Sequence, residues 1–410
     1  MKLLISLGIF CLFINENVNA QFSLSAELRP RTEYSHGYGT LVTEDNNGQT
    51  PSLFTSQRTR LNFDYQEDLL KVGIVLQDVR TWGNQPQLVG NEDFATSLHQ
   101  AWAEINFTPE ISIKAGRQEL VYDDHRIFGN VGWVQQARSH DVALFKYTGN
   151  INVHLGLAHH ENTIRTDNVY GGPDAYKNLQ FLWVNQKLPD VMWSLLFLNN
   201  GKPVTEGTEE KTRYSQTFGT HLEVPLEKLA FVGNFYYQTG EDGPHRSLKA
   251  FNFLAEAGYW FNDITQLQLG YEILSGTDYD IVEKNRSFTP FYGTNHKFNG
   301  YMDYFYVGNH LNSVGLTDVY VKFSTAIYNT DFNADVHLFS SAADVSATAD
   351  KYLGTEIDLT LSHEISPSAR VSLGYSHMFA GESMEILKGG IKDATHNWAY
   401  IMLTVTPKFF

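Results

Sequence analysis

Over most of this chain, apolar and polar residues alternate one by one in short segments. In the first such segment one face carries Phe22, Leu24 and Leu28, and the other carries Glu27 and Arg29. Successive side chains of a β-strand point to opposite faces, so this period of two predicts strands between apolar and wet surroundings. About eighteen such segments follow one another, and no helical stripe competes with them. They begin near residues 22, 57, 71, 98, 111, 140, 151, 178, 191, 214, 228, 249, 264, 317, 332, 353, 368 and 396.

The connections between these segments are alternately short and long. Eight are tight turns such as 66–68, and nine are long and polar: 35–54, 83–96, 121–139, 161–176, 200–212, 239–248, 276–316, 340–352 and 380–394. Outer-membrane barrels have this layout of short periplasmic turns and long extracellular loops. Because lipid cannot satisfy backbone polar groups, a sheet survives there only if it closes on itself. We therefore expect an all-β fold, an 18-stranded antiparallel transmembrane β-barrel.

A secreted β-sandwich or propeller would alternate as well. Such a fold would explain neither the rhythm of long and short connections nor the polar residues that lie opposite aromatic-rich faces, among them Glu27, Glu256 and Glu272. The barrel is therefore the preferred interpretation.

The first 20 residues differ from the rest. Lys2 precedes the apolar stretch LLISLGIFCLFI, and small residues occupy positions 18 and 20, as in a cleaved secretory signal. We expect residues 1–20 to be removed and 21–410 to form a single barrel domain in the cell outer membrane. A lipoprotein anchored through Cys11 is the alternative, but Phe10 stands where a small residue is required. Beyond this segment no apolar run approaches the roughly 18 residues that a spanning helix needs.

Charge and cysteine content exclude several classes of protein. The 46 acidic residues outnumber 30 basic ones, which argues against a nucleic-acid partner. The only Cys is Cys11, in the expected signal segment, so neither a disulfide framework nor a Cys-rich zinc site is available.

Two stretches carry a family resemblance: AGRQELVYDDHRIFGNVGW at 115–133, followed by QQARSHDVALF at 135–145, and FYGTNHKFNGYMDYF at 291–305. They resemble the alginate export family of outer-membrane porins. The resemblance implies an export channel for a uronate polymer, with arginines lining a narrow electropositive pore. The matching arginines are Arg117, Arg126 and Arg138.

A basic wall is expected on the early strands. Eight of the thirteen arginines lie between residues 29 and 138. An arginine facing lipid would cost about 2–4 kcal/mol at the bilayer midplane, so the strand phase assigns these cations to the lumen. Guanidinium groups match carboxylates bidentately, which predicts an anion-preferring ladder. The residues facing the lumen by phase are Arg29, Arg31, Arg58, Arg60, Lys71 and Lys114.

The other interpretation of these arginines is structural: they pair with the lumen carboxylates Glu27, Asp64 and Glu104 and brace the wall. The two interpretations are compatible, since porins often oppose a basic wall to an acidic one. Later strands supply that acidic wall, which consists of Glu223, Glu256, Glu272, Glu356 and Asp358.

The connection at 276–316 is too long for a plain turn, and loops of this length are usually functional. We hypothesise that it folds into the barrel as a constriction, with His296, Lys297 and Asp303 near the passage. An extracellular lid or interaction surface is the alternative.

No cofactor, no metal site and no catalytic residue is expected. His159 with His160 lacks a third anchored ligand, and Ser376 and His377 are neighbours on a strand that point to opposite faces. Acidic loop groups, Glu44 with Asp45 or Asp278 with Asp280, leave loop Ca²⁺ binding open.

The expected function is passive diffusion of anionic or sugar-like solutes through a porin that is not an enzyme. A barrel enzyme and an adhesion or structural barrel acting through its loops are the alternatives. The expected partners are the lipid bilayer with lipopolysaccharide, an anionic or carbohydrate solute, and the barrel-assembly machinery, which reads terminal strands ending in aromatics such as Phe409 and Phe410.

Overall fold

The computed structural model describes residues 21–43, 51–85, 87, 96–161, 176–207, 209–243, 246–306 and 308–410, with backbone alone at 209–210. The predicted signal segment 1–20 and the acidic pair Glu44 and Asp45 lie outside these residues. Both hypotheses therefore stay predictions.

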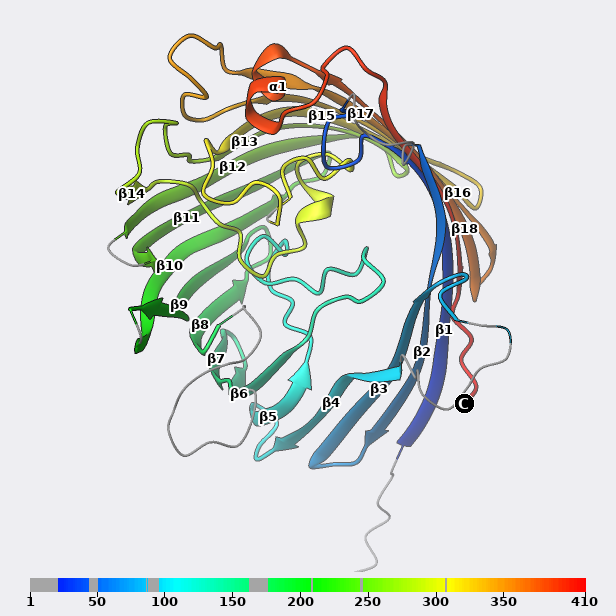
Figure 1. The fold of residues 1–410 in the computed structure, drawn as a ribbon. Helices are drawn as coiled ribbons and strands as arrows, with labels where there is room; N and C mark the ends of the chain where they lie inside the picture. The colour runs from blue at the N-terminus through cyan, green and yellow to red at the C-terminus, as the bar shows by residue number, and fades with distance from the viewer. Residues whose placement is uncertain are drawn as a thin grey trace, which may run out of the picture.

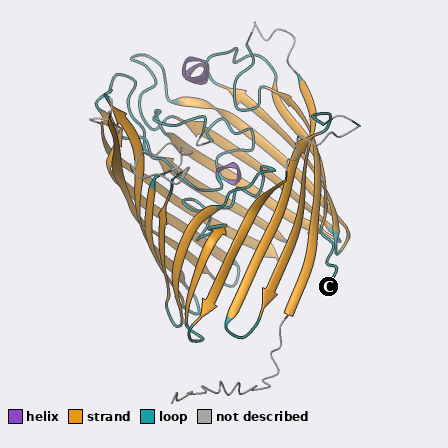
Figure 2. Ribbon diagram, turned by 60° about the horizontal axis from the view of Figure 1, so that its bottom comes forward, coloured by secondary structure: helices purple, strands orange, loops and turns teal. Residues whose placement is uncertain are grey.

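The described strands form one antiparallel barrel (Figures 1 and 2). The sheet closes because β1 pairs with both β2 and β19. The barrel strands are β1 (Gln21–His36), β2 (Ser52–Gln66), β3 (Leu70–Thr81), β4 (Thr96–Asn106), β5 (Ile111–Gln118), β6 (His140–Thr148), β7 (Asn152–His159), β8 (Asn178–Lys187), β9 (Met192–Glu206), β10 (Glu209–Pro225), β11 (Leu229–Gly243), β12 (Arg246–Asn262), β13 (Thr265–Leu274), β15 (Leu316–Ile327), β16 (Thr330–Ser340), β17 (Tyr352–Ser366), β18 (Ala369–Ala380) and β19 (His396–Val405).

These eighteen strands confirm the predicted fold, and each begins within five residues of its predicted start. The smaller elements are β14 (Lys284–Asn285), which pairs parallel to β12, the 3-10 turn η1 (Asn295–Lys297) and the helix α1 (Glu382–Lys388). Neither helix among the described residues is long and apolar enough to span a membrane.

Two connections differ from the prediction. Residues 200–212 and 239–248 were expected to be long loops, but β9 continues to Glu206 and β10 begins at Glu209, while β11 and β12 extend to Gly243 and from Arg246. Polar side chains on both faces conceal the strand period there, although the backbone ladder continues.

The barrel is apolar outside and polar inside. Leu195, Phe197 and Leu338 point outward with 51%, 47% and 49% of their surface exposed. Gln238 and Asn252 point inward and are fully buried. Soluble proteins bury apolar side chains and expose polar ones. A lipid-embedded barrel requires the reverse, as found here.

Two long connections lie inside the barrel (Figures 1 and 2). Loop A is residues 119–139, between β5 and β6, and loop B is residues 275–315, between β13 and β15. Their backbones pair: Tyr292 N donates to Ile127 O (3.1 Å), and Gly129 N donates to Tyr292 O (2.8 Å). The two loops therefore form a single ledge across the lumen.

Candidate pore constriction

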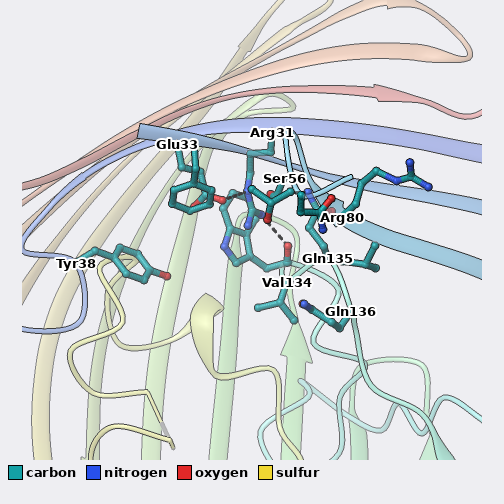
Figure 3. Close-up of a pocket in the computed structure, with 13 residues that line it drawn as sticks. Arg31, Glu33, Tyr38, Ser56, Arg80, Val134, Gln135 and Gln136 are labelled. Carbon is teal, nitrogen blue, oxygen red and sulfur yellow. Dashed lines mark hydrogen bonds and ion pairs between the residues drawn. The ribbon is translucent and has the colours of Figure 1, made fainter. Parts of the chain in front are cut away.

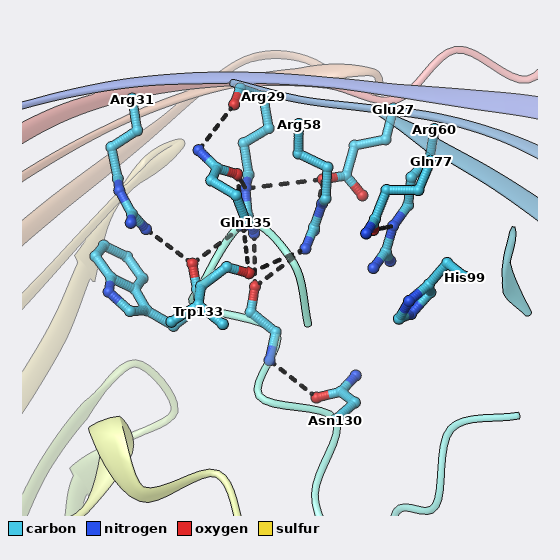
Figure 4. Close-up of polar contacts among 12 residues, drawn as sticks. Glu27, Arg29, Arg31, Arg58, Arg60, Gln77, His99, Asn130, Trp133 and Gln135 are labelled. Atoms are coloured by element: carbon cyan, nitrogen blue, oxygen red, sulfur yellow. Dashed lines mark hydrogen bonds and ion pairs between the residues drawn. The ribbon is translucent and has the colours of Figure 1, made fainter. Parts of the chain in front are cut away.

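The arginines of β1 and β2 bind the tip of loop A, which is residues 132–136. Arg29 donates to the carbonyl oxygens of Gly132 (2.8 Å) and Trp133 (3.0 Å), and Arg31 donates to that of Trp133 (2.8 Å). Arg58 lies within 3.4 Å of Gly132 O. Figure 4 shows these guanidinium groups pointing from the wall towards loop A. Because these arginines share the strand face opposite the exposed Leu28 and Leu61, the strand period alone aims all three side chains inward.

Carboxylates on the same wall offset part of this charge. Glu27 binds Arg58 through two contacts of 2.6 and 2.9 Å, and Glu33 binds Arg31 at 2.8 Å. Arg60 donates to Gln77 (2.7 Å) and lies 3.8 Å from Glu119. The wall is thus braced by ion pairs and also binds a loop.

Lysines provide the basic groups that have no such partner. Lys114 Nζ lies 3.7 Å above the ring centroid of Trp102, and Lys71 is the cross-strand neighbour of Glu104 on the inner face. Within the described part of the chain, neither lysine forms a hydrogen bond or an ion pair, nor do Lys297 and Lys322. Glu104 instead binds Lys146 at 2.8 Å.

The prediction that Arg117 lines the pore is wrong. Arg117 lies on the outer face of β5, in phase with the exposed Ile111, and pairs with the exposed Asp141 at 3.1 Å. The inner face of this strand is taken by Ser112, Lys114 and Gln118, since strand phase, rather than the motif, decides the direction.

Arg126 and Arg138 lie in loop A and connect it to other parts of the ledge. Arg126 is buried, pairs with Glu272 of β13, and stacks over the ring of Phe298 at 3.7 Å. Arg138 donates to Gly293 O of loop B (3.2 Å), and burial lowers its pKa. Both arginines therefore stabilise the ledge.

The acidic wall binds backbone N–H groups of loop B, whereas the arginines bind backbone carbonyl oxygens of loop A. Glu356 accepts a hydrogen bond from Met302 N (2.7 Å) and Asp358 accepts one from Tyr301 N (3.3 Å). The close approach needs Gly300, whose φ is +79° and where a Cβ would lie 2.6 Å from Glu356 Oε1.

The other predicted acidic residues also point inward. Glu272 accepts from Asn252 (2.8 Å), and Glu256 accepts from Tyr320 (2.7 Å). Glu223 lies apart, near the end of β10, and contacts His221 at 3.0 Å.

At the tip of the ledge, His296 connects loop B to loop A. Its ring stacks on Trp133, with centroids 4.6 Å apart and planes 10° apart, and on Tyr301 at 5.2 Å. Its Nδ1 lies 3.0 Å from Asp303, which also accepts a hydrogen bond from Tyr38.

Lys297 is exposed within the lumen, and its Nζ lies 5.1 Å from the centroid of the Phe298 ring. The protein that surrounds the lumen partly desolvates its ammonium group and lowers its pKa, while the nearby Asp124 opposes the shift and Lys322 adds to it. Lys297 is therefore the predicted constriction residue whose charge is available to a solute.

Two cavities flank the tip of loop A. One of about 500 Å³ lies towards the long connections and is lined by Arg31, Glu33, Tyr38 and Trp133 among others (Figure 3). The other, of about 410 Å³, lies towards the short turns and is lined by residues that include Arg29, Trp133, His296, Lys297, Tyr301 and Tyr400. Trp133 lines both cavities, so the tip separates them.

Loop A as a constriction element, with Trp133 and Gln135 as its contact residues, was not predicted from the sequence. One signal in the sequence pointed to loop A: the apolar residues Ile127 and Phe128 interrupt a connection that was taken as polar. Both side chains are buried in the structure. The acceptors on Gly132 and Trp133 are backbone carbonyls, which no residue pattern reveals.

In the described residues, no group of three or more His, Cys, Asp or Glu side chains is placed to hold a metal ion. Of the second acidic pair, Asp278 lies 3.9 Å from Arg286.

Comparisons with known proteins agree with this architecture. The family model for alginate export matches residues 198–394. Pseudomonas aeruginosa OccK11 (OpdR) superposes with a TM-score of 0.61 at 12% identity, covering 96% of this chain and 97% of that one. P. aeruginosa OccK3 (OpdO) gives 0.64 at 13%, covering 95% and 96%. P. aeruginosa OpdK, solved with vanillate, gives 0.60 at 9%, covering 94% and 99%. No curated protein matches the sequence.

Proposed function

We propose that this chain, which belongs to the alginate export family, conducts carboxylated and sugar-like solutes by passive diffusion through its outer-membrane barrel. Family membership and the likeness to porin barrels support an outer-membrane channel. The charges around the ledge support the class of solute.

Among the described residues, the lumen cations that form neither a hydrogen bond nor an ion pair lie around the ledge, and this placement carries the proposal. Lys71 and Lys114 lie on its basic side, towards the short turns, and Lys297 lies at its tip. The opposite carboxylates Glu356 and Asp358 are buried against loop B. A solute in the passage responds to this local field rather than to the net charge of -16. The field therefore favours anions.

The test is a planar-bilayer recording in a salt gradient, where the reversal potential reports ion preference. We expect anion preference in the unmodified protein and a shift of the reversal potential towards zero after replacing Lys71, Lys114 and Lys297 with Ala. Lys249→Ala is the matched control, because Lys249 is exposed on the outward face of β12. Absence of conductance, or a preference for cations in the unmodified protein, would refute the proposal.

The solute class is tested separately by flux into liposomes. We expect glucuronate and short uronate oligomers to enter faster than neutral sugars of equal size. Equal rates would contradict a carboxylate preference while leaving the channel itself intact.

A further inference from the structure

The tip of loop A is bounded by two strained residues. Val131 has a φ of +49° and Ala137 a φ of +54°. The left-handed region is unfavourable for residues with a Cβ and most of all for a β-branched valine. Such strain persists only where surrounding contacts impose it. The contacts that hold residues 132–136 therefore hold them against a backbone preference to move.

Those contacts converge on Arg29. This buried guanidinium donates to Gly132 O (2.8 Å), Trp133 O (3.0 Å) and Gln135 Oε1 (3.0 and 3.1 Å). Its nearest carboxylate, Glu27, is 3.8 Å away and binds Arg58 more closely. Among the described residues, all hydrogen bonds of Arg29 thus go to neutral oxygens.

Arg31 supports the same tip. It donates to Trp133 O (2.8 Å), and its guanidinium carbon lies 4.1 Å from the centroid of the Trp133 ring. Arg31 lines the cavity towards the long connections, whereas Arg29 lines the cavity towards the short turns. The tip and its two arginines therefore lie between the two cavities.

A carboxylate is a better acceptor for guanidinium than a carbonyl, because charge-assisted hydrogen bonds are shorter and about twice as strong, and because two parallel bonds can form. A solute carboxylate reaching Arg29 would thus compete with the loop for the same donors, and the strain at Val131 and Ala137 favours release of the loop.

We propose that Arg29 and Arg31 form a carboxylate-binding site that the tip of loop A occupies in the resting channel. A solute carboxylate replaces the carbonyl oxygens of Gly132 and Trp133 as the acceptor, the tip moves about Val131 and Ala137, and the two cavities join. This inference rests on the proposed function, since it assumes that carboxylated solutes enter the lumen.

The first test fixes the tip to the wall. The sequence has no Cys beyond Cys11, so Ser56→Cys with Gln136→Cys, which line one cavity, can be joined by a short bifunctional thiol reagent with a reducible link. We expect crosslinking to lower glucuronate flux at least tenfold, to change chloride conductance less than twofold, and to be reversed by reductant. Equal glucuronate flux before and after crosslinking would overturn the inference. Failure of the proposed function would differ, because the protein without crosslinker would then carry no glucuronate.

The second test follows the motion. Gln135 donates to Ser56 (3.0 Å), so the tip covers this position on the wall. We expect glucuronate, but not glucose, to raise the rate of thiol modification of Ser56→Cys several-fold. Asn62→Cys, on the same face of β2 and away from the tip, is the matched control and should show no increase. An unchanged rate at Ser56→Cys would contradict the movement.

Discussion

At the scale of single residues, the arginines of the early strands bind the protein itself. Arg29 and Arg31 donate to loop A, and Arg58 lies between loop A and Glu27. The structural interpretation of these side chains therefore accounts for most of their hydrogen bonds, whereas Lys71, Lys114 and Lys297 form no hydrogen bond or ion pair with the described residues.

Glu27 offers a direct test of this wall. Glu27→Ala leaves Arg58 buried without its carboxylate, and loss of one partner of a buried pair is expected to cost about 3 kcal/mol. The measurement is the free energy of unfolding in urea for the barrel in detergent or lipid. The control is Glu364→Ala, an exposed residue 4.0 Å from Arg370, where a loss below about 1 kcal/mol is expected. Equal losses in the two variants would contradict the role of Glu27.

Lys297 gives a prediction in pH. Its pKa is lowered by desolvation, so its charge is complete below the lowered pKa and disappears as the pH rises through it. As the pH rises, the anion preference of the channel should therefore begin to decline at a lower pH than it would if Lys297 had the pKa of an ordinary lysine. The charged neighbours Asp124, Arg126, Lys322 and Glu256 face the same space.

Lys297→Arg should reduce this early decline, because arginine keeps its charge throughout the range, while the other lumen lysines still titrate. Reversal potentials measured from pH 6 upward, roughly to the ordinary lysine pKa near 10.4, compare the two proteins. Superimposable profiles would exclude Lys297 from the selective passage.

At the scale of elements, each loop contacts its wall through the backbone group whose partial charge is opposite to the charge of that wall. Loop A presents carbonyl oxygens to arginines, and loop B presents N–H groups to Glu356 and Asp358. The strands themselves were predictable from alternation. The hairpin of β9 and β10 was not predicted at full length, because both of its faces are polar beyond the apolar band.

Gly300 tests how closely loop B must approach its wall. In Gly300→Ala, a Cβ would lie 2.6 Å from Glu356 Oε1 at a φ of +79°, so we expect displacement of loop B and a changed single-channel conductance. Stability should fall by about 1–3 kcal/mol. Gly207→Ala has the same kind of φ, +65°, with no atom within 4 Å, and controls for strain alone. If the two variants conduct alike, the contact with Glu356 does not position the loop.

At the scale of the whole molecule, the ledge joins an arginine-bearing wall to a carboxylate-bearing wall across the lumen. Tyr292 of loop B pairs with Ile127 and Gly129 of loop A at its centre. The closed sheet provides attachment on both sides, so we expect the width of the passage to depend on these loops more than on the number of strands.

Removing the centre of loop B tests this dependence. Deletion of residues 280–300 removes Tyr292 and His296, and with them the pairing to loop A and the stack on Trp133. We expect single-channel conductance to increase several-fold and anion preference to weaken, with the β-sheet circular dichroism retained. Conductance equal to that of the unmodified protein would show that loop B does not constrict the passage.

The sequence by itself determined the strands, their inward and outward faces and the closed barrel, because lipid and water impose a period of two on every spanning segment. Tertiary structure alone decided that loop A lies in the lumen and that Arg29 and Arg31 bind its carbonyl oxygens. The physical reason is that backbone acceptors and loop paths leave no residue pattern, so they become visible only when distant segments meet.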